Sequence, residues 1–248
     1  MSASSSPNIR RVRDLLIIDD LVIATDSIGG IGPKPADTVA ADAATVAHFA
    51  LRVPLLEVLC AGAQPIAVID DLCVELEPTG AAMIAEIRRL AADAGVLPAA
   101  VTGSTEDNVT TVATGIGVTV LGRLSPGRRL GGGSRSGDVV VCAGRPISAP
   151  RDEVYIGHPG QVPVAAVAAA LASGVVHDAL PVGSKGLAWE VPQLATEGLT
   201  VHWCESSIDR SDSGGPSSCV LFSCAAADLD TLVAALSTAP TAVVAELR

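Results

Sequence analysis

The sequence predicts a mixed α/β or α+β protein whose chain is divided into two halves. Short apolar runs typical of strands alternate with Ala-rich segments of helical spacing along the chain. The composition is globular, with 49% hydrophobic but only 2% aromatic residues, so the core must consist mainly of Ala, Val, Leu and Ile. A run rich in Gly, Ser and Arg, residues 125–137, marks the boundary between the halves.

This boundary divides the chain into four expected parts. Residues 1–13 form a mobile tail, residues 14–124 an N-terminal domain, residues 125–137 a linking loop and residues 138–248 a C-terminal domain. The tail carries arginines at positions 10, 11 and 13. Contact of these arginines with a ligand or a partner is the alternative to mobility.

The elements of the first half follow from hydrophobic periodicity and turn residues. In chain order we expect strands at 15–18 and 21–25, a glycine-rich loop at 27–35, a helix at 38–59, a turn at 62–65, a strand at 66–76, a helix at 80–94 and a strand at 109–121. Pro54 should kink or restart the first of these helices.

The second half repeats this mixture of strands and helices. We expect a strand at 138–143, helices at 162–173 and 187–195, a strand at 199–204, a loop at 210–216, a strand at 218–224, a helix at 229–236 and a strand at 241–247. Because strands and helices are mixed in both halves, neither an all-α nor an all-β fold fits the pattern.

Charge and composition exclude some partners. The formal net charge is −11, which argues against general nucleic-acid binding, because that relies on neutralising phosphates with Lys and Arg. No run of apolar residues is long enough for a membrane span, and the first residues lack the apolar core of a signal peptide. The six cysteines form no C-x-x-C pair and are expected to be buried free thiols. We therefore expect a cytoplasmic protein without membrane or nucleic-acid partners.

The most informative stretch is the octet V-T-G-S-T-E-D-N, Val101 to Asn108, where an apolar approach ends in polar residues. Gly103 lets the backbone turn or approach a ligand closely. The residues that offer hydroxyl, carboxylate or amide oxygens are Ser104, Thr105, Glu106, Asp107 and Asn108. These groups suggest a site for phosphate and a hard cation.

Acidic residues elsewhere extend this hypothesis. Asp26 ends an apolar run before the glycine-rich loop, and either binds Mg²⁺ or caps a turn. Glu57 lies among apolar residues of the first helix, and either faces solvent or points into a site. Asp70 and Asp71 are adjacent in a strand, so at most one of them faces a given site. Mg²⁺ takes one or two carboxylates with waters and phosphate oxygens, and Asp26, Glu57 and Glu106 could supply them if folding brings them together.

A second polar cluster, P-V-G-S-K-G at Pro181 to Gly186, surrounds Lys185 with small residues. Backbone and ammonium contacts to an anion are one interpretation, and an ordinary turn with a solvated lysine is the other. His177 and Asp178 precede the cluster and either take part in acid–base chemistry or are structural. No G-x-S-x-G or H-E-x-x-H motif favours a hydrolase.

The order of several segments resembles the aminoimidazole-ribonucleotide-synthetase-like (PurM-like) superfamily, which includes thiamine-monophosphate kinase, selenophosphate synthetase and the hydrogenase-maturation dehydratase. The matching segments are I-A-T-D-S, L-L-E-V-L-C-A-G-A-Q-P, V-T-G-S-T-E-D-N, V-H-D-A-L-P-V-G-S-K-G and G-G-P-S-S-C-V-L. They span residues 21–220, and their order is more specific than any one of them. T-G-S-T-E and P-V-G-S-K-G are most similar to α-ribazole kinase, a cobamide-salvage enzyme.

The resemblance implies an N-terminal ATP-binding domain, a C-terminal α/β domain, and a homodimer whose N-terminal sheets join into a barrel. Asp26 matches the metal-binding Asp after the early strand, and Glu57 matches an Asp of the helix segment. Ser104 and Thr105 match the second acidic-Thr pair, but Ser104 replaces the usual acid, so Glu106 takes its role or metal affinity falls. The second half is also short for the superfamily.

Together these observations predict an ATP- and Mg²⁺-dependent phosphotransferase, a kinase that acts on a small alcohol-bearing metabolite such as α-ribazole. The expected catalytic residues are Asp26, Glu106 and Lys185, the expected metal ligands are Asp26, Glu57 and Glu106, and the expected nucleotide contacts are Ser27, Gly103, Ser104, Thr105 and Asn108. Two alternatives are a synthetase that works through an acyl- or amidyl-phosphate, and a non-catalytic nucleotide-binding protein. Catalysis would rest on positioning and charge stabilisation.

Overall fold

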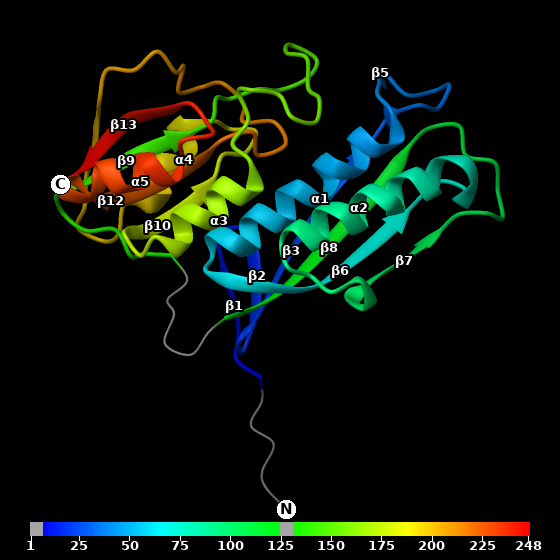
Figure 1. Cartoon of the computed structure of the whole chain (residues 1–248), viewed down its shortest axis with the longest axis horizontal. Coiled ribbons are helices and arrows are strands. Elements are labelled where there is room, and N and C mark those ends of the chain that lie inside the picture. The colour runs from blue at the N-terminus through cyan, green and yellow to red at the C-terminus, as the bar shows by residue number, and fades with distance from the viewer. Residues whose placement is uncertain (1–6, 125–130) are drawn as a thin grey trace, which may run out of the picture.

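A computed structural model describes residues 7–124 and 131–248. It contains a six-stranded and a five-stranded sheet, with a two-stranded parallel pair beside the first (Figure 1). The six-stranded sheet has the order β1-β2-β3-β8-β6-β7 and is open in the single chain. Its strands are β1 (Ile9–Val12), β2 (Leu15–Ile18), β3 (Leu21–Gly29), β6 (Ala63–Leu72), β7 (Val101–Thr105) and β8 (Gly115–Leu124).

Helices cover only one face of this sheet. The helices are α1 (Ala43–Cys60) and α2 (Ala81–Asp93), the short pair is β4 (Ile31–Gly32) with β5 (Val39–Ala40), and single turns lie at η1 (Leu76–Gly80) and η2 (Pro98–Ala100). Side chains alternate between the faces of each strand, so Val22 and Ala24 are buried against α1 while Thr25 and Ser27 are exposed. Asp42 caps α1 by accepting a hydrogen bond from the Thr45 amide at 2.8 Å.

The second sheet is antiparallel throughout and has helices on both faces. Its order is β10-β12-β9-β13-β11. Its strands are β9 (Asp138–Ala143), β10 (Val176–Pro181), β11 (Val201–Trp203), β12 (Val220–Ala225) and β13 (Thr241–Leu247), and its helices are α3 (Val164–Ala172), α4 (Leu187–Leu194) and α5 (Leu229–Ala235), with the turn η3 (Ala226–Asp228). Val139 and Val141 of β9 pack towards α3 and α5, whereas Val140 and Cys142 pack towards α4.

The two halves share one hydrophobic core. Leu51 and Leu55 of α1, Val118 of β8, Val167 of α3 and Phe222 of β12 belong to a single buried cluster. Helix α1 therefore lies between the six-stranded sheet on one side and α3 with β10 on the other (Figure 1). This helix is long and apolar enough to cross a membrane by length and composition, but 67% of it is buried inside the protein, as befits a core helix.

A buried arginine holds α1 to the second half. Arg52 is only 2% exposed and has no carboxylate partner in the described part of the chain. Its guanidinium donates to the carbonyl oxygen of Val162 at 2.6 Å and twice to that of Ser217, at 3.0 and 3.2 Å. Burial lowers the pKa of Arg52 to about 10, which leaves the group charged at neutral pH. The hydrogen bonds fix Ser217 in the left-handed region, with φ of 52°.

Several expected boundaries are corrected. Residues 9–12 form β1 instead of a mobile tail, while residues 1–6 lie outside the described part. The expected turn at 62–65 gives way to β6, and the strand expected at 109–121 begins only at Gly115. Pro54 sits inside one continuous α1. Of the expected linking loop, residues 131–137 are described and residues 125–130 are not. The division into domains stays a prediction.

Candidate functional site

Asp26 lies within a strand instead of at its end. β3 continues from Leu21 to Gly29, and Asp26 is paired with Val118 of β8. Its partly buried carboxylate shares the helix-covered face with Val22 and Ala24. Burial raises the pKa of Asp26, and a hydrogen bond from the Ser27 amide opposes this increase. The expectation of a strand-end ligand is therefore wrong about the backbone, although the carboxylate remains available.

Glu57 is a strongly perturbed carboxyl group of α1. It lies where α1 of the first half meets β10 of the second half, a boundary that we call the seam. There it lines a small cavity of about 10 Å³ together with Arg13 and Pro181. Burial, followed by the charges of Asp14 and Glu190, raises the pKa of Glu57 to about 8. Glu57 is thus partly buried beside this cavity, which favours the interpretation that it points into a site.

Four acidic residues near the seam between the halves influence one another through their charges, and we call them the seam carboxylates. They are Asp14, Asp26, Glu57 and Glu190. Asp14 and Asp26 both act on Glu57 through their charges, and Asp14 acts on Glu190 as well. Burial is also the main reason why the pKa of Glu190 is raised. Two cations oppose these effects, because the charge of Arg13 lowers the pKa of Glu57 and Glu190 and that of Lys185 lowers the pKa of Glu190.

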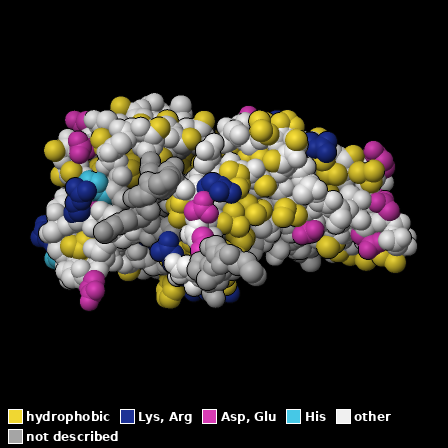
Figure 2. Space-filling model, turned by 90° about the horizontal axis from the view of Figure 1, so that it is seen from below, with side chains coloured by type: hydrophobic (Ala, Val, Ile, Leu, Met, Phe, Trp, Pro, Cys, Tyr) yellow, Lys and Arg dark blue, Asp and Glu magenta, His cyan; other side chains and the backbone are white. Residues whose placement is uncertain are grey.

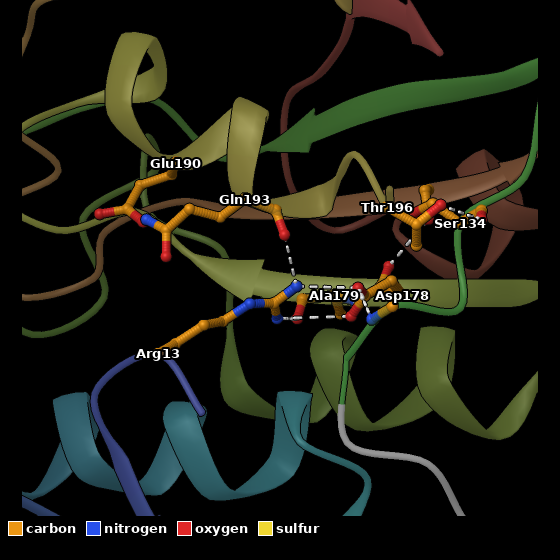
Figure 3. Close-up of polar contacts among 9 residues, drawn as sticks. Arg13, Ser134, Asp178, Ala179, Glu190, Gln193 and Thr196 are labelled. Carbon is orange, nitrogen blue, oxygen red and sulfur yellow. Dashed lines mark hydrogen bonds and ion pairs between the residues drawn. The ribbon is translucent and has the colours of Figure 1, made fainter. Parts of the chain in front are cut away.

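Arg13, the nearest cation, is already paired. Its guanidinium donates to the Asp178 carboxylate at 2.8 and 3.4 Å and to the carbonyl oxygens of Ala179 and Gln193, both at 3.1 Å. Figure 3 shows Arg13 reaching from the first half to Asp178 on β10, with Glu190 on α4 pointing away from this contact. The Arg13–Asp178 pair ties the β1–β2 turn to the second sheet.

Lys185 is exposed beside the seam carboxylates. Its ammonium lies 3.9 Å from the ring centroid of Trp189, at the start of α4, and its charge lowers the pKa of Glu190 in opposition to burial. Seen from below, Lys/Arg and Asp/Glu side chains lie near one another and beside hydrophobic side chains in the middle of the molecule (Figure 2). Lys185 is therefore free to meet an anion.

His177 and Asp178 are structural residues. The Nδ1 atom of His177 lies 2.8 Å from the carboxylate of Asp138, and Asp178 accepts from Arg13 and from the Gly132 amide at 2.9 Å. Both carboxylates are almost fully buried. The acid–base interpretation of this pair has no support in these contacts, because each group is engaged in holding β10 in place.

The octet is an edge strand followed by a tight turn. Val101–Thr105 is β7, which pairs in parallel with β6 so that Gly103 lies beside Asp70 and Ser104 beside Asp71. Asp107 accepts from the Leu76 amide at 3.0 Å and from the Thr105 hydroxyl at 2.7 Å, and Glu106 accepts from the Asn108 amide at 2.8 Å. The acidic residues of the octet therefore shape its turn.

The sheet register separates the octet from Asp26. Asp26, Val118, Asp70 and Gly103 lie in one row across β3, β8, β6 and β7. Three strand spacings of about 4.8 Å place Gly103 roughly 14 Å from Asp26, and Glu106 lies three residues further along. Asp26 and Glu106 of one chain thus do not share an ion, and the expected three-carboxylate site does not form.

The glycine-rich loop is folded onto the sheet. Asp37 accepts from the amides of Lys34 and Thr114 at 2.8 and 2.7 Å and from the Thr114 hydroxyl at 2.7 Å. Lys34 forms an ion pair with Glu75. A side chain at Gly32 would lie 2.2 Å from the Thr114 hydroxyl, so the close packing requires glycine there. This loop is occupied by its own contacts.

Asp14 and Glu190 were missed in the sequence. Asp14 follows three arginines in a segment that has the composition of a tail, and Glu190 is five residues beyond Lys185 in the first turn of a short helix. Glu190 could have been noticed as an acidic residue near Lys185 in the sequence. Asp14 could not, because its position at the seam depends on the β1–β2 turn.

The fold has counterparts among solved structures. No protein-family model matches the chain, and no curated protein matches it. The likeness to solved structures is one of fold. The hydrogenase maturation protein HypE in its complex with HypF matches with a TM-score of 0.67 and 13% identity over 95% of this chain and 87% of that one. Thiamine-monophosphate kinase from Stenotrophomonas maltophilia matches with a TM-score of 0.66 and 16% identity over 99% and 89%. HypE in complex with ATP matches with a TM-score of 0.66 and 15% identity over 92% and 76%.

Proposed function

We propose that the chain is an ATP- and Mg²⁺-dependent phosphotransferase that acts on a small alcohol-bearing metabolite. The observation that carries this proposal is the group of seam carboxylates, which act on one another through their charges and have Arg13 and Lys185 beside them. Its PurM-like fold adds support, since structural neighbours include a kinase and an ATP complex. We further propose α-ribazole as the acceptor and the cytoplasm as the location.

Asp26 and Glu57 are the proposed Mg²⁺ ligands. Their donor set fits the ion, because Mg²⁺ is usually bound by one or two carboxylates and keeps waters and phosphate oxygens as its other ligands. No three acidic, His or Cys side chains of the described residues already converge on a metal position. A nucleotide phosphate would therefore complete the site, and the bound ion would supply charge stabilisation to the transferred phosphoryl group.

The chain's own residues do the positioning. Lys185 would contact a phosphate or the acceptor from the α4 side of the seam. Ser27, Gly103, Ser104, Thr105 and Asn108 remain the proposed nucleotide contacts, with Glu106 as a residue that shapes the octet turn. Because Gly103 lies roughly 14 Å from Asp26, an extended triphosphate nucleotide would be needed to join the two regions.

We also propose that two copies pair through the uncovered face of the six-stranded sheet. Leu16, Ile23, Leu121 and Ala67 form one apolar row across this face, and each side chain is only partly buried. A contiguous apolar row without a covering layer is typical of an interaction surface. Two rows further along the same face, the row of Ser27, Gly117, Asp71 and Ser104 is small and polar.

Leu121→Glu should convert the dimer to a monomer, because it buries a charge at the centre of the paired faces. Sedimentation should give twice the 24.9 kDa chain mass for the unaltered protein and a single chain mass for this variant. Ala85→Glu, on the exposed surface of α2, is the matched control and should leave the dimer intact. A monomeric unaltered protein would contradict the pairing.

The phosphotransferase proposal is tested by incubation with ATP, Mg²⁺ and candidate alcohols, α-ribazole first, with ADP and product mass as readouts. Stoichiometric phosphorylated alcohol is expected. The midpoint temperature of thermal denaturation should also rise when ATP and Mg²⁺ are both present. A ligand at 100 times its dissociation constant stabilises the folded state by about 2.7 kcal/mol. ADP with an acyl or amide product would favour the synthetase alternative, and stabilisation without turnover the non-catalytic one. If ATP and Mg²⁺ cause neither stabilisation nor turnover, all three proposals are refuted.

A further inference from the structure

A second cleft lies away from the seam, between α2 and the edge strand β7. It has a volume of about 270 Å³, slightly below the range of pockets that hold drug-sized ligands. Leu76, Ile84 and Val101 provide apolar walls, and Asp70 and Arg88 provide charged groups. The hydroxyl groups of Thr102, Ser104 and Thr105 also line the cleft, so its walls are mixed, and such polar groups can fix the orientation of a ligand.

Asp70 is the buried polar group of this cleft. The residue is 3% exposed, and its carboxylate accepts no hydrogen bond from any described residue. Burial raises the pKa of Asp70, whereas the charge of Arg88 lowers it. Asp71, the next residue, is exposed on the opposite face. Because the Asp70 carboxylate lines the cleft and has no donor among the described residues, it is available to accept a hydrogen bond from a molecule bound there.

Gly103 keeps the carboxylate accessible from the strand side. A side chain at this position would lie 1.9 Å from the carbonyl oxygen and 2.4 Å from the Oδ1 atom of Asp70. Any other residue would therefore displace β7 or the carboxylate. Gly103 belongs to the octet, and the close approach of Asp70 explains why the octet has a glycine at this position.

The two charged groups define the chemistry of a molecule bound in the cleft. A carboxylate accepts an N–H group, and a guanidinium donates to a lone pair. Arg88 also opposes a simple cation or metal ion, because its own positive charge acts on Asp70. The expected partner therefore carries an N–H donor next to an acceptor on one edge. Purine bases have this pattern.

We propose that the cleft between α2 and β7 binds the purine base of a nucleotide, with Asp70 accepting a hydrogen bond from the base and Arg88 donating to its adjacent ring nitrogen or oxygen. This inference rests on the proposed function, for which it assigns the base end of the nucleotide. The row from Gly103 to Asp26 then runs from the base site towards the seam carboxylates.

Nucleosides without phosphate test the base site separately from the reaction. The ¹⁵N-labelled full chain is titrated with adenosine, guanosine and purine riboside, which keeps the purine ring but lacks the N–H donor, while the amides of Gly103 and Ile84 are followed by NMR. Adenosine should bind at least about tenfold more tightly than purine riboside, as expected for a hydrogen bond to a charged group. Asp70→Leu keeps the volume, removes both acceptors and should abolish this preference.

Two neighbouring arginines supply the matched control. Arg88→Gln should weaken adenosine binding at least threefold, and Arg89→Gln should not change it, because Arg89 is paired with Glu86 and Asp93 outside the cleft. Guanosine binding with the same Asp70 dependence supports the base site but changes the expected nucleotide. Asp70-dependent binding without ATP turnover retains the base site and refutes the phosphotransferase. Equal binding of all three nucleosides, or no change at the cleft amides, overturns the inference.

Discussion

Replacing Asp26 by asparagine should lower the kcat of Mg²⁺-dependent phosphoryl transfer by about 10²–10³-fold, the effect of losing one electrostatic contact to a transition state. The substitution keeps the size of the side chain and removes the negative charge that would hold the cation. Because burial raises the pKa of Asp26, the neutral amide should fit the site without loss of stability. The measurement is steady-state turnover over a range of Mg²⁺ concentrations.

Asp93→Asn provides the control for this experiment. Asp93 is an exposed residue of α2 whose only ion pair among the described residues is with Arg89 at 2.8 Å. The Asp93→Asn variant should have the same kcat as the unaltered protein. Unchanged turnover in Asp26→Asn would remove Asp26 from the site, and equal loss in both variants would indicate a general charge effect.

The stability of the protein without Mg²⁺ should fall as the pH rises from about 5 to about 8. Glu57 has a folded-state pKa of about 8 against an ordinary value of 4.5, so within this window the folded chain holds a proton that the unfolded chain releases. The stabilising contribution is complete below the ordinary pKa and disappears through the folded pKa. A single group of this kind changes the free energy of unfolding by up to about 1.4 kcal/mol per pH unit.

Urea denaturation at several pH values, with EDTA present, measures this slope. Glu57→Gln should match the unaltered protein near pH 5 and exceed its free energy of unfolding near pH 8, because the amide cannot ionise. Asp26 and Glu190 also have raised pKa values, so a weaker slope of the same sign should remain. A slope that is unchanged in Glu57→Gln would assign the pH dependence to other groups.

Local pattern was sufficient to predict much of the fold. The last strand, Thr241–Leu247, and the strand Asp138–Ala143 have the expected bounds, because continuous apolar runs bordered by turn residues define buried strands. The strand expected at 109–121 begins only at Gly115, because Val109 and Val112 are exposed in a loop that the octet turn holds in place. Alternation alone cannot distinguish such a loop from a half-buried strand.

The candidate site was only partly predictable, for a different reason. Glu57 stood out as a carboxylate among apolar residues, but its companions depend on chain pairing that local pattern does not reveal. Asp14 reaches the seam through the β1–β2 turn, and the distance between Asp26 and Glu106 follows from strand order. The glycine at position 103 is visible in the sequence. The reason that glycine is needed there, the adjacent carboxylate of Asp70, appears only in the parallel register of β6 and β7.

The shared core around α1 has a consequence for dissecting the protein. Arg52 and the apolar residues of α1 are satisfied only when both sheets are present, since the acceptors of Arg52 are carbonyl groups of the second half. A fragment that ends after β8 would expose the face of α1 that packs against the second half. It would also leave the Arg52 guanidinium without its hydrogen-bond acceptors. The chain should therefore melt in one cooperative transition, and neither half should be obtainable as an independent folding unit.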